Sequence, residues 1–171
     1  MLQVYKRMQK MREKYVDTLA KLYEYATTVY SKKQYTQWYD TKKGGYTYAS
    51  FKEKCDSLSK VLTQYGIGAG DKVAILSQSM PNWSVAFFSL APFGRIVIPI
   101  LPDSSQNEVT NIINHSETKA IFVSQRLAGK VSEEVKDKMV LIIDIDTLEI
   151  VKSDDEHFTC DGKTSVPTPE D

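Results

Sequence analysis

Residues 71–101, DKVAILSQSMPNWSVAFFSLAPFGRIVIPIL, constrain the fold more than any other stretch of the chain. Residues 73–76 are apolar without alternation, which is typical of a strand that helices cover on both faces. A second buried strand is predicted at residues 96–98, and we expect Pro99 and Pro102 to end it. Because a helical segment separates the two strands, the stretch predicts one β-α-β unit with a parallel, right-handed crossover.

The helix between these strands is predicted to begin at Pro81, since proline suits the first turn of a helix. Pro92 should distort its last turn, and Gly94 is the expected C-terminal stop. The helix is apolar almost all round, so it should be buried on most sides. With about 12 residues it is too short to span a bilayer, which needs about 20.

Further elements are predicted on both sides of this unit by their periodicity. A preceding helix with apolar residues at helical spacing is expected to be capped by Thr47 or Ser50, and a following helix by Asp103 or Ser104. The other core elements are a third strand at 120–123, a mostly helical segment at 124–138 and a fourth strand at 139–143. This order predicts an α/β fold with a doubly wound, mainly parallel sheet and helices on both faces.

Residues 1–30 predict one long helix, because apolar residues recur at a spacing near 3.6 along it. Its other face is rich in lysine and arginine. We favour a helix packed on the domain, with a basic amphipathic helix on a membrane surface and a dimer contact as alternatives. The aromatic run at 35–39 and the YTY at 46–48 predict a short hairpin around a glycine-containing turn.

Composition excludes some classes of function. Lysine plus arginine and aspartate plus glutamate number 22 each, so no global field attracts nucleic acid. The two cysteines imply no disulfide framework, and no signal-peptide pattern opens the chain, so a cytoplasmic location is expected. We divide the 171 residues into a helical segment at 1–34, an α/β subdomain at 35–151 and a polar connection at 152–171.

Two features could suggest chemistry but favour structural roles. Cys55 lies on the predicted core face of its helix, which favours a buried thiol over a nucleophile. The run GIGAGD at 66–71 resembles a phosphate loop superficially. However, its glycines follow a helix and open a strand, whereas a phosphate loop follows a strand and opens a helix. Gly66 therefore predicts the C-terminal cap of a helix.

Three polar groups are equally weak as sites. His115 is expected at a helix end, making a local hydrogen bond. Asp144 and Asp146 could form an acid pair, but solvated side chains at a strand end are favoured. His157 and Cys160 supply only two of the ligands that a zinc site needs.

The carboxyl ends of the predicted strands are where a ligand of such a sheet would bind. They fall at residues 77–81, 100–104, 124–125 and 144. None of these stretches contains a GxSxG serine elbow, a phosphate loop ending in GK[ST], an HExxH helix or a four-ligand metal set. We therefore assign no catalytic, cofactor-binding or metal-binding residue.

Several blocks in order nevertheless resemble a known family. YTYASFKEKCDSLSKVLTQYGIGAGDKVAILSQSMPNW is similar to the opening of the AMP-forming acyl-CoA synthetases of the adenylate-forming superfamily, and GRIVIPILPDSSQNEVTNIINHSETKAIFVS to their next block. The similarity extends over roughly residues 18–151 and is closest to bacterial long-chain fatty-acid–CoA ligases. Ser79, Asn82 and Arg95 depart from the residues usual in the family.

The resemblance implies a reaction in two steps. ATP and a carboxylate give an acyl-adenylate and pyrophosphate with the help of Mg²⁺, and the thiol of coenzyme A then displaces AMP. In the family, a loop similar to VPTPED leads into the phosphate loop, so we expect this chain to be an inactive amino-terminal part of the enzyme and its domain to be partial. Fatty acid, ATP and coenzyme A should then bind downstream of residue 171.

Other functions stay open at this point. The parent enzyme could activate a medium-chain, aryl or amino acid, or the chain could be a non-catalytic interaction module on the same scaffold. Peripheral membrane contact through residues 1–30 is a further alternative. A partial domain should also expose apolar surface, so we expect the fragment to self-associate.

Overall fold

The computed structural model of the chain describes residues 3, 6, 18–37 and 45–153. They form a five-stranded sheet in the order β2-β1-β3-β4-β5. The strands are β1 (Lys72–Leu76), β2 (Ile96–Ile100), β3 (Ala120–Val123), β4 (Leu141–Asp144) and β5 (Glu149–Ser153). The first four run parallel, and β5 is antiparallel to β4, which confirms the mainly parallel sheet.

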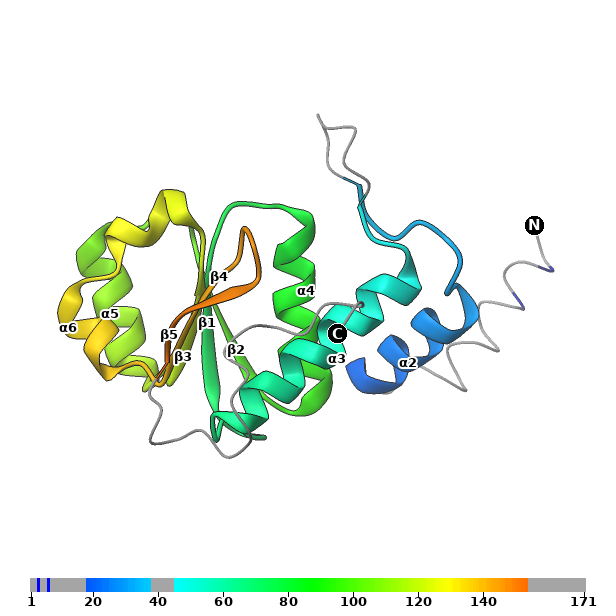
Figure 1. Ribbon diagram of the computed structural model, residues 1–171, viewed down its shortest axis with the longest axis horizontal. Coiled ribbons are helices and arrows are strands. Elements are labelled where there is room, and N and C mark those ends of the chain that lie inside the picture. Colours follow the sequence, from blue (N-terminus) through cyan, green and yellow to red (C-terminus); the bar gives the residue numbers. More distant parts are fainter. Residues whose placement is uncertain (1–2, 4–5, 7–17, 38–44, 154–171) are drawn as a thin grey trace.

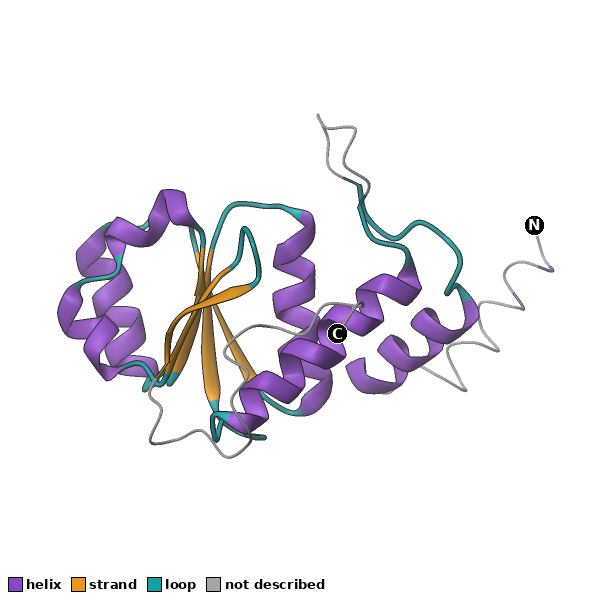
Figure 2. Ribbon diagram, viewed as in Figure 1, coloured by secondary structure: helices purple, strands orange, loops and turns teal. Residues whose placement is uncertain are grey.

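Helices cover both faces of the sheet, as the doubly wound prediction requires (Figures 1 and 2). One face packs against α3 (Tyr48–Gln64) and α4 (Pro81–Leu90), with α2 (Leu19–Val29) lying outside α3. The other face packs against α5 (Gln106–Ser116), the 3₁₀ helix η2 (Gln125–Lys130) and α6 (Glu133–Lys138). We call these the α3/α4 face and the α5/α6 face.

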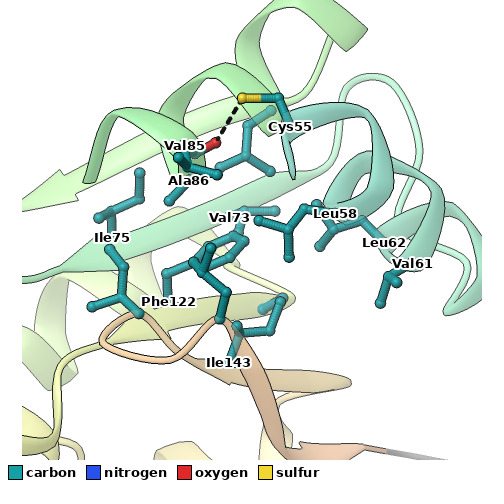
Figure 3. Packing of buried hydrophobic residues seen from close by; sticks show 14 of the residues in the cluster. Cys55, Leu58, Val61, Leu62, Val73, Ile75, Val85, Ala86, Phe122 and Ile143 are labelled. Atoms are coloured by element: carbon teal, nitrogen blue, oxygen red, sulfur yellow. Dashed lines mark hydrogen bonds between the residues drawn. The ribbon is translucent and has the colours of Figure 1, made fainter. Parts of the chain in front are cut away.

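Alternate residues of each strand supply the two cores. Val73, Ile75 and Phe122 belong to the buried cluster on the α3/α4 face, and Ala74 and Leu76 to the one on the α5/α6 face. This pattern explains why β1 is apolar without alternation, since both of its faces are covered. Figure 3 shows part of the α3/α4 core, in which side chains from α3, α4 and three strands interlock.

The β-α-β unit forms as predicted, with one correction. Pro81 is the first residue of α4, the 3₁₀ helix η1 (Ala91–Phe93) contains Pro92, and Gly94 follows in the left-handed region with φ 80°. Pro99, however, lies inside β2 opposite Ile75 instead of ending the strand. Proline is tolerated there because β2 is an edge strand. For the same reason β2 is only partly buried.

Three boundaries also differ from the sequence prediction. The cap of α5 is Ser105, one residue beyond the expected Ser104 and two beyond Asp103, and it forms a capping box with Glu108. The segment 124–138 forms two short helices, η2 and α6, instead of one. The strand β5 was missed, and it extends the sheet past the expected boundary at 151/152 to Ser153. The rest of the predicted connection, 154–171, lies outside the described residues.

The predicted single helix over 1–30 is wrong at Thr18. This residue has an extended backbone (φ −141°, ψ 154°) and caps α2 by accepting a hydrogen bond from the Lys21 N–H. α2 then packs through Tyr23 and Thr27, and the Tyr23 hydroxyl donates to Asp56 at 2.8 Å. The packing interpretation is therefore confirmed for residues 19–29.

The predicted hairpin is seen only at its open end. Gln34 and Thr47 form an antiparallel bridge, and the Tyr35 N–H donates to the Tyr46 carbonyl at 2.7 Å. Its tip, 38–44, lies outside the described residues. Thr47 caps α3 in a capping box with Ser50, so both expected capping residues take part. Within the described ranges, no helix has the length and apolar character needed to cross a membrane.

Candidate functional site

The carboxyl edge of the sheet is the place where an α/β fold of this type binds ligands. The chain leaves β1 to form β2 on one side and then crosses to form β3 on the other side of β1. The switch point therefore lies between the ends of β1 and β3. Ser77 and Gln78 follow β1 there, and Ser124 and Gln125 follow β3.

Hydrogen bonds close the edge between β1 and β3. The Ser124 hydroxyl donates to Gln78 Oε1 at 3.1 Å, and the Ser124 N–H donates to the Leu76 carbonyl at 3.1 Å. Ser124 is fully buried. Its hydroxyl therefore serves as an internal link between the loops that follow the two strands, and it is not presented to solvent.

The edge between β3 and β4 is joined through two carboxylates. Gln125 Nε2 donates to Asp144 Oδ2 at 2.6 Å, and the Gln125 N–H donates to Asp146 Oδ2 at 2.8 Å. The Asp146 N–H in turn donates to Asp144 Oδ1 at 2.8 Å. Asp144 is buried, so the expectation that both side chains would be solvated is wrong for this residue. Both carboxylates are held by neighbouring donors.

Asn82, in the first turn of α4, extends this network to a third element. Its Nδ2 donates to the carbonyls of Ile145 and Asp146 at 2.8 and 3.1 Å, while its Oδ1 accepts from the Tyr46 hydroxyl at 2.6 Å. The side chain is buried, and all of these bonds lie within the chain. Asn82 thus joins the hairpin, α4 and the β4–β5 turn. We name Gln78, Asn82, Ser124, Gln125, Asp144 and Asp146 the carboxyl-edge network.

The loop after β2 is held separately. Lys130, at the end of η2, donates through Nζ to the carbonyls of Pro102 and Ser104 at 2.6 and 2.8 Å. The Lys130 ammonium group therefore binds the main-chain oxygens of this loop and is not available as a cation for a phosphate. The predicted site residues follow the carboxyl ends of four strands. Hydrogen bonds join the residues that follow β1, β3 and β4, whereas Lys130 binds the loop after β2 to η2.

A nucleotide or Mg²⁺ does not fit this network. A phosphate cradle needs free N–H or hydroxyl donors that converge on one point, and Mg²⁺ needs free oxygen ligands. Here Gln125 donates to Asp144 and Asn82 donates to the Ile145 and Asp146 carbonyls, and the part of the chain that the structure describes has no cluster of three or more metal-ligating residues. These hydrogen bonds link the loops of the edge to one another.

Cys55 is buried in the α3/α4 core, as predicted. Its Sγ donates to the Val85 carbonyl at 3.6 Å (Figure 3). Burial raises the pKa of the Cys55 thiol, and the neighbouring Asp56 carboxylate raises it further. A thiol that is both inaccessible and hard to ionise is not a nucleophile.

The glycine run at 66–71 is a helix end, also as predicted. Gly66 has φ 71°, and the Ile67 N–H returns to the Leu62 carbonyl at 2.9 Å, which closes the last turn of α3. The Gly68 N–H donates to the Asp71 carboxylate at 2.8 Å. The loop therefore already holds an anion of its own, which argues further against a phosphate site.

Arg95 is the residue whose role the sequence did not reveal. It is only 5% exposed, and its guanidinium donates to five acceptors: the carbonyls of Ile67, Ser59 and Ser89 and the hydroxyls of Ser59 and Thr63. This cation joins α3, the glycine run and α4. Its only signal in the sequence was a departure from the family pattern, which cannot show where a side chain points.

The remaining sequence candidates gain no support as sites. His115 is exposed in the last turn of α5. The local hydrogen bond expected for it is not made with any described residue. His157 and Cys160 lie outside the described residues.

A groove of about 300 Å³ lies between η2, α6 and strands β3 to β5. Its apolar lining includes Val123, Val131, Ile142 and Val151. Its lysines are already paired: Lys136 binds Glu133 at 2.7 Å, and Lys152 donates to the Lys136 carbonyl at 2.6 Å. The volume is at the lower end of the range for ligand pockets, and no convergent polar groups mark the groove as a binding site.

Comparison with known proteins finds one matching family and several similar ligases. Residues 24–171 match the family described as AMP-binding enzyme. The 4-hydroxybutyrate–CoA ligase 2 of Metallosphaera sedula is 28% identical over 104 residues, which are 59% of this chain and 19% of the relative. The long chain acyl-CoA synthetase 2 of Arabidopsis thaliana is 26% identical over 95 residues, 54% of this chain and 14% of the relative. The chain thus spans about a fifth or less of the length of these relatives.

Solved structures show the same fold. The fatty acyl CoA synthetase of Mycobacterium tuberculosis superposes with a TM-score of 0.66 at 21% identity, over 77% of this chain and 27% of that protein. The anthranilate CoA ligase AuaEII, in complex with anthranoyl-AMP, gives a TM-score of 0.66 at 17% identity, over 74% of this chain and 24% of that protein. At these identities the likeness supports the architecture alone.

Proposed function

The chain belongs to the AMP-binding enzyme family, and we propose that it is the amino-terminal scaffold of an AMP-forming long-chain fatty-acid–CoA ligase. In this proposal the parent enzyme lets the fatty-acid carboxylate attack the α-phosphorus of ATP, with loss of pyrophosphate. The thiol of coenzyme A then attacks the acyl carbonyl, and AMP leaves. The chain itself performs neither step. It acts in the cytoplasm as the support on which a downstream nucleotide site is held.

The carboxyl-edge network carries this proposal. The Gln125 amide donates to the Asp144 carboxylate at 2.6 Å, and the Asn82 amide donates to the Ile145 carbonyl at 2.8 Å. A site built for a triphosphate would keep such donors free. An edge that is already closed suits a rigid support, because it positions the loops after β1, β3 and β4 before any ligand arrives.

A fatty acid is the substrate that we favour among the acids of this family. Two of the similar proteins described above carry fatty acyl or long chain acyl in their names. Others are named for 4-hydroxybutyrate and anthranilate, so a short or aromatic acid is the competing proposal. The names of these proteins support both proposals, and we assign the choice of acid to the downstream part.

Exchange of labelled pyrophosphate into ATP tests the proposal. We expect no acid-dependent exchange with this chain alone, and exchange with the complete gene product in the presence of a long-chain fatty acid. Isothermal titration of ATP into the chain alone should likewise show no saturable binding. Saturable binding, or exchange by the chain alone, would contradict the scaffold role. Exchange by the complete product with aryl or short acids only would contradict the choice of substrate.

A further inference from the structure

The free edge of β2 presents an unusual combination of sequence and position. Its register pairs Lys72 to Leu76 of β1 with Ile96 to Ile100, and no described residue pairs with its other side. The segment 96–101, IVIPIL, is uncharged and rich in β-branched residues. Such a segment on an open edge is a template for pairing with another strand.

The hydrogen-bond pattern shows which residues of β2 face outwards. The Ile96 N–H donates to the Asp71 carbonyl at 2.8 Å, so Ile96, Ile98 and Ile100 bind β1 through their main chains. Since main-chain groups alternate along a strand, Val97 and Pro99 point towards the open edge. Pro99 therefore costs the sheet no internal hydrogen bond, and it deletes a donor where a new strand would need one.

Side-chain charge does not protect this edge. Lysine or arginine commonly blocks an open strand, but the adjacent Arg95 turns inwards and is only 5% exposed. In contrast, β5 at the opposite edge carries Glu149 and Lys152, and its ladder with β4 is irregular between Ile142 and Ile143. The two edges thus differ in their protection, and within the described residues Pro99 is the one protective feature that we find at the β2 edge.

We propose that Pro99 blocks the addition of a further strand to the β2 edge, including β2 of a second copy of this chain. The occupant that it excludes is an apolar strand, which would have to pair with an edge that lacks a donor at its centre. Any self-association of the chain through other apolar surface would then proceed without extending the sheet.

Sedimentation velocity on matched variants tests this role. In Pro99→Val, which restores the N–H and suits a strand, we expect a weight-average mass about twice that of the wild type or more at equal concentration. Pro102→Val removes a proline just beyond the strand and should sediment as the wild type does. Adding Ile96→Lys to Pro99→Val places a charge on the edge, at a side chain that is 45% exposed, and should reverse the association.

Two outcomes of this comparison would overturn the proposal. One is a Pro99→Val variant that sediments as the wild type does. The other is association that Ile96→Lys does not reverse or that Pro102→Val reproduces, because it would not pass through the β2 edge.

Hydrogen exchange on the wild-type chain provides a test that does not depend on a variant folding. The Val97 amide, which faces the open edge, should exchange quickly at every protein concentration, whereas the Ile98 amide, which faces β1, should be protected. Protection of Val97 that rises with concentration would show that strands pair at this edge despite Pro99, and would refute the inference.

Discussion

The two faces of the sheet are packed in different ways. The α3/α4 face is covered by helices that are themselves backed by α2, and its core includes aromatic residues such as Tyr23, Phe51 and Phe122. The α5/α6 face is aliphatic, is covered by α5 and by the two six-residue helices η2 and α6, and leaves the 300 Å³ groove beside Ile142. On the α5/α6 face a groove therefore reaches the strands themselves, whereas the cavities of about 440 and 200 Å³ on the α3/α4 side are lined by the hairpin, the helices and the loop before α4, away from the strands.

The difference indicates where stability resides. A filled core cannot collapse around a lost side chain, whereas a core next to a groove can relax into the space. We therefore expect the α3/α4 face to be sensitive to truncation and the α5/α6 face to be more tolerant. Adjacent residues of one strand make this comparison directly, since they differ in little except the face that they occupy.

The largest expected effect comes from Ile143→Ala, compared with Ile142→Ala. Ile143 is fully buried on the α3/α4 face, and we expect its truncation to lower the free energy of unfolding by about 4 kcal/mol. Ile142 lines the groove, so its truncation should cost about 2 kcal/mol. Urea unfolding followed by circular dichroism measures both. Equal losses would show that the groove does not relieve the cavity.

A smaller effect is expected from Arg95→Met, which removes a charge from the α3/α4 side. Methionine can fill part of the space, but the Ile67 and Ser59 carbonyls would lose their buried donors. We expect a loss of about 2 kcal/mol, and a similar loss for Arg95→Lys, because a lysine cannot reproduce the guanidinium geometry.

The matched control for Arg95 is Lys130→Met, which removes a cation from the α5/α6 side. Its loss should be smaller, since Lys130 is only partly buried and binds the carbonyls of a surface loop. Urea unfolding again provides the measurement. A stable Arg95→Met variant would show that the buried hydrogen bonds contribute little net stability.

The smallest effect concerns pH. Burial would raise the pKa of the Asp71 carboxyl, but Lys119, 2.7 Å away, and the Gly68 N–H outweigh it and hold the pKa below its ordinary value. A carboxyl with a lowered pKa stabilises the fold above its unfolded pKa of about 3.9, and this contribution is lost as the pH falls through the folded value.

Asp71→Asn should therefore flatten the acid limb of the stability curve. The pair is partly exposed, so we expect a difference of less than about 1 kcal/mol at neutral pH. Unfolding curves of both proteins between about pH 2 and 7 provide the measurement. Parallel curves would mean that Asp71 has the same pKa in the folded and unfolded chains.

The sequence predicted the α3/α4 face better than the edges of the sheet. Strong periodicity and turn residues revealed β1, α4 and the cap at Thr47, because these signals are local. The strand β5 escaped because polar residues predominate in it, and because the turn before it uses Leu148 at φ 65° where a glycine would have been recognisable. The sequence also did not show that Pro99 lies inside a strand. Proline is tolerated in an edge strand, but whether a strand lies at an edge depends on the order of the strands in the sheet, which the sequence does not give.

The polar residues of the candidate site were the least predictable. Asp144 and Asn82 are buried because partners from distant segments satisfy them, and a single sequence does not reveal such pairings. Arg95 was similarly hidden, since acceptors from α3, the glycine run and α4 together make its burial tolerable. Catalytic motifs are local and can be searched for in the sequence alone, whereas the hydrogen bonds that join Gln125 to Asp144 and Asn82 to Ile145 cannot be read from it.

The amide of Asn82 also has a consequence for the order in which the chain matures. Its acceptors lie at Ile145 and Asp146, more than 60 positions further along, so they leave the ribosome well after α4 does. Until then the Asn82 side chain, which is buried in the folded protein, can form only its hydrogen bond with the Tyr46 hydroxyl. We therefore expect water to bind the Asn82 amide while α4 is newly synthesised. The β4–β5 turn then replaces this water with its own carbonyls, so the first turn of α4 becomes buried late in synthesis.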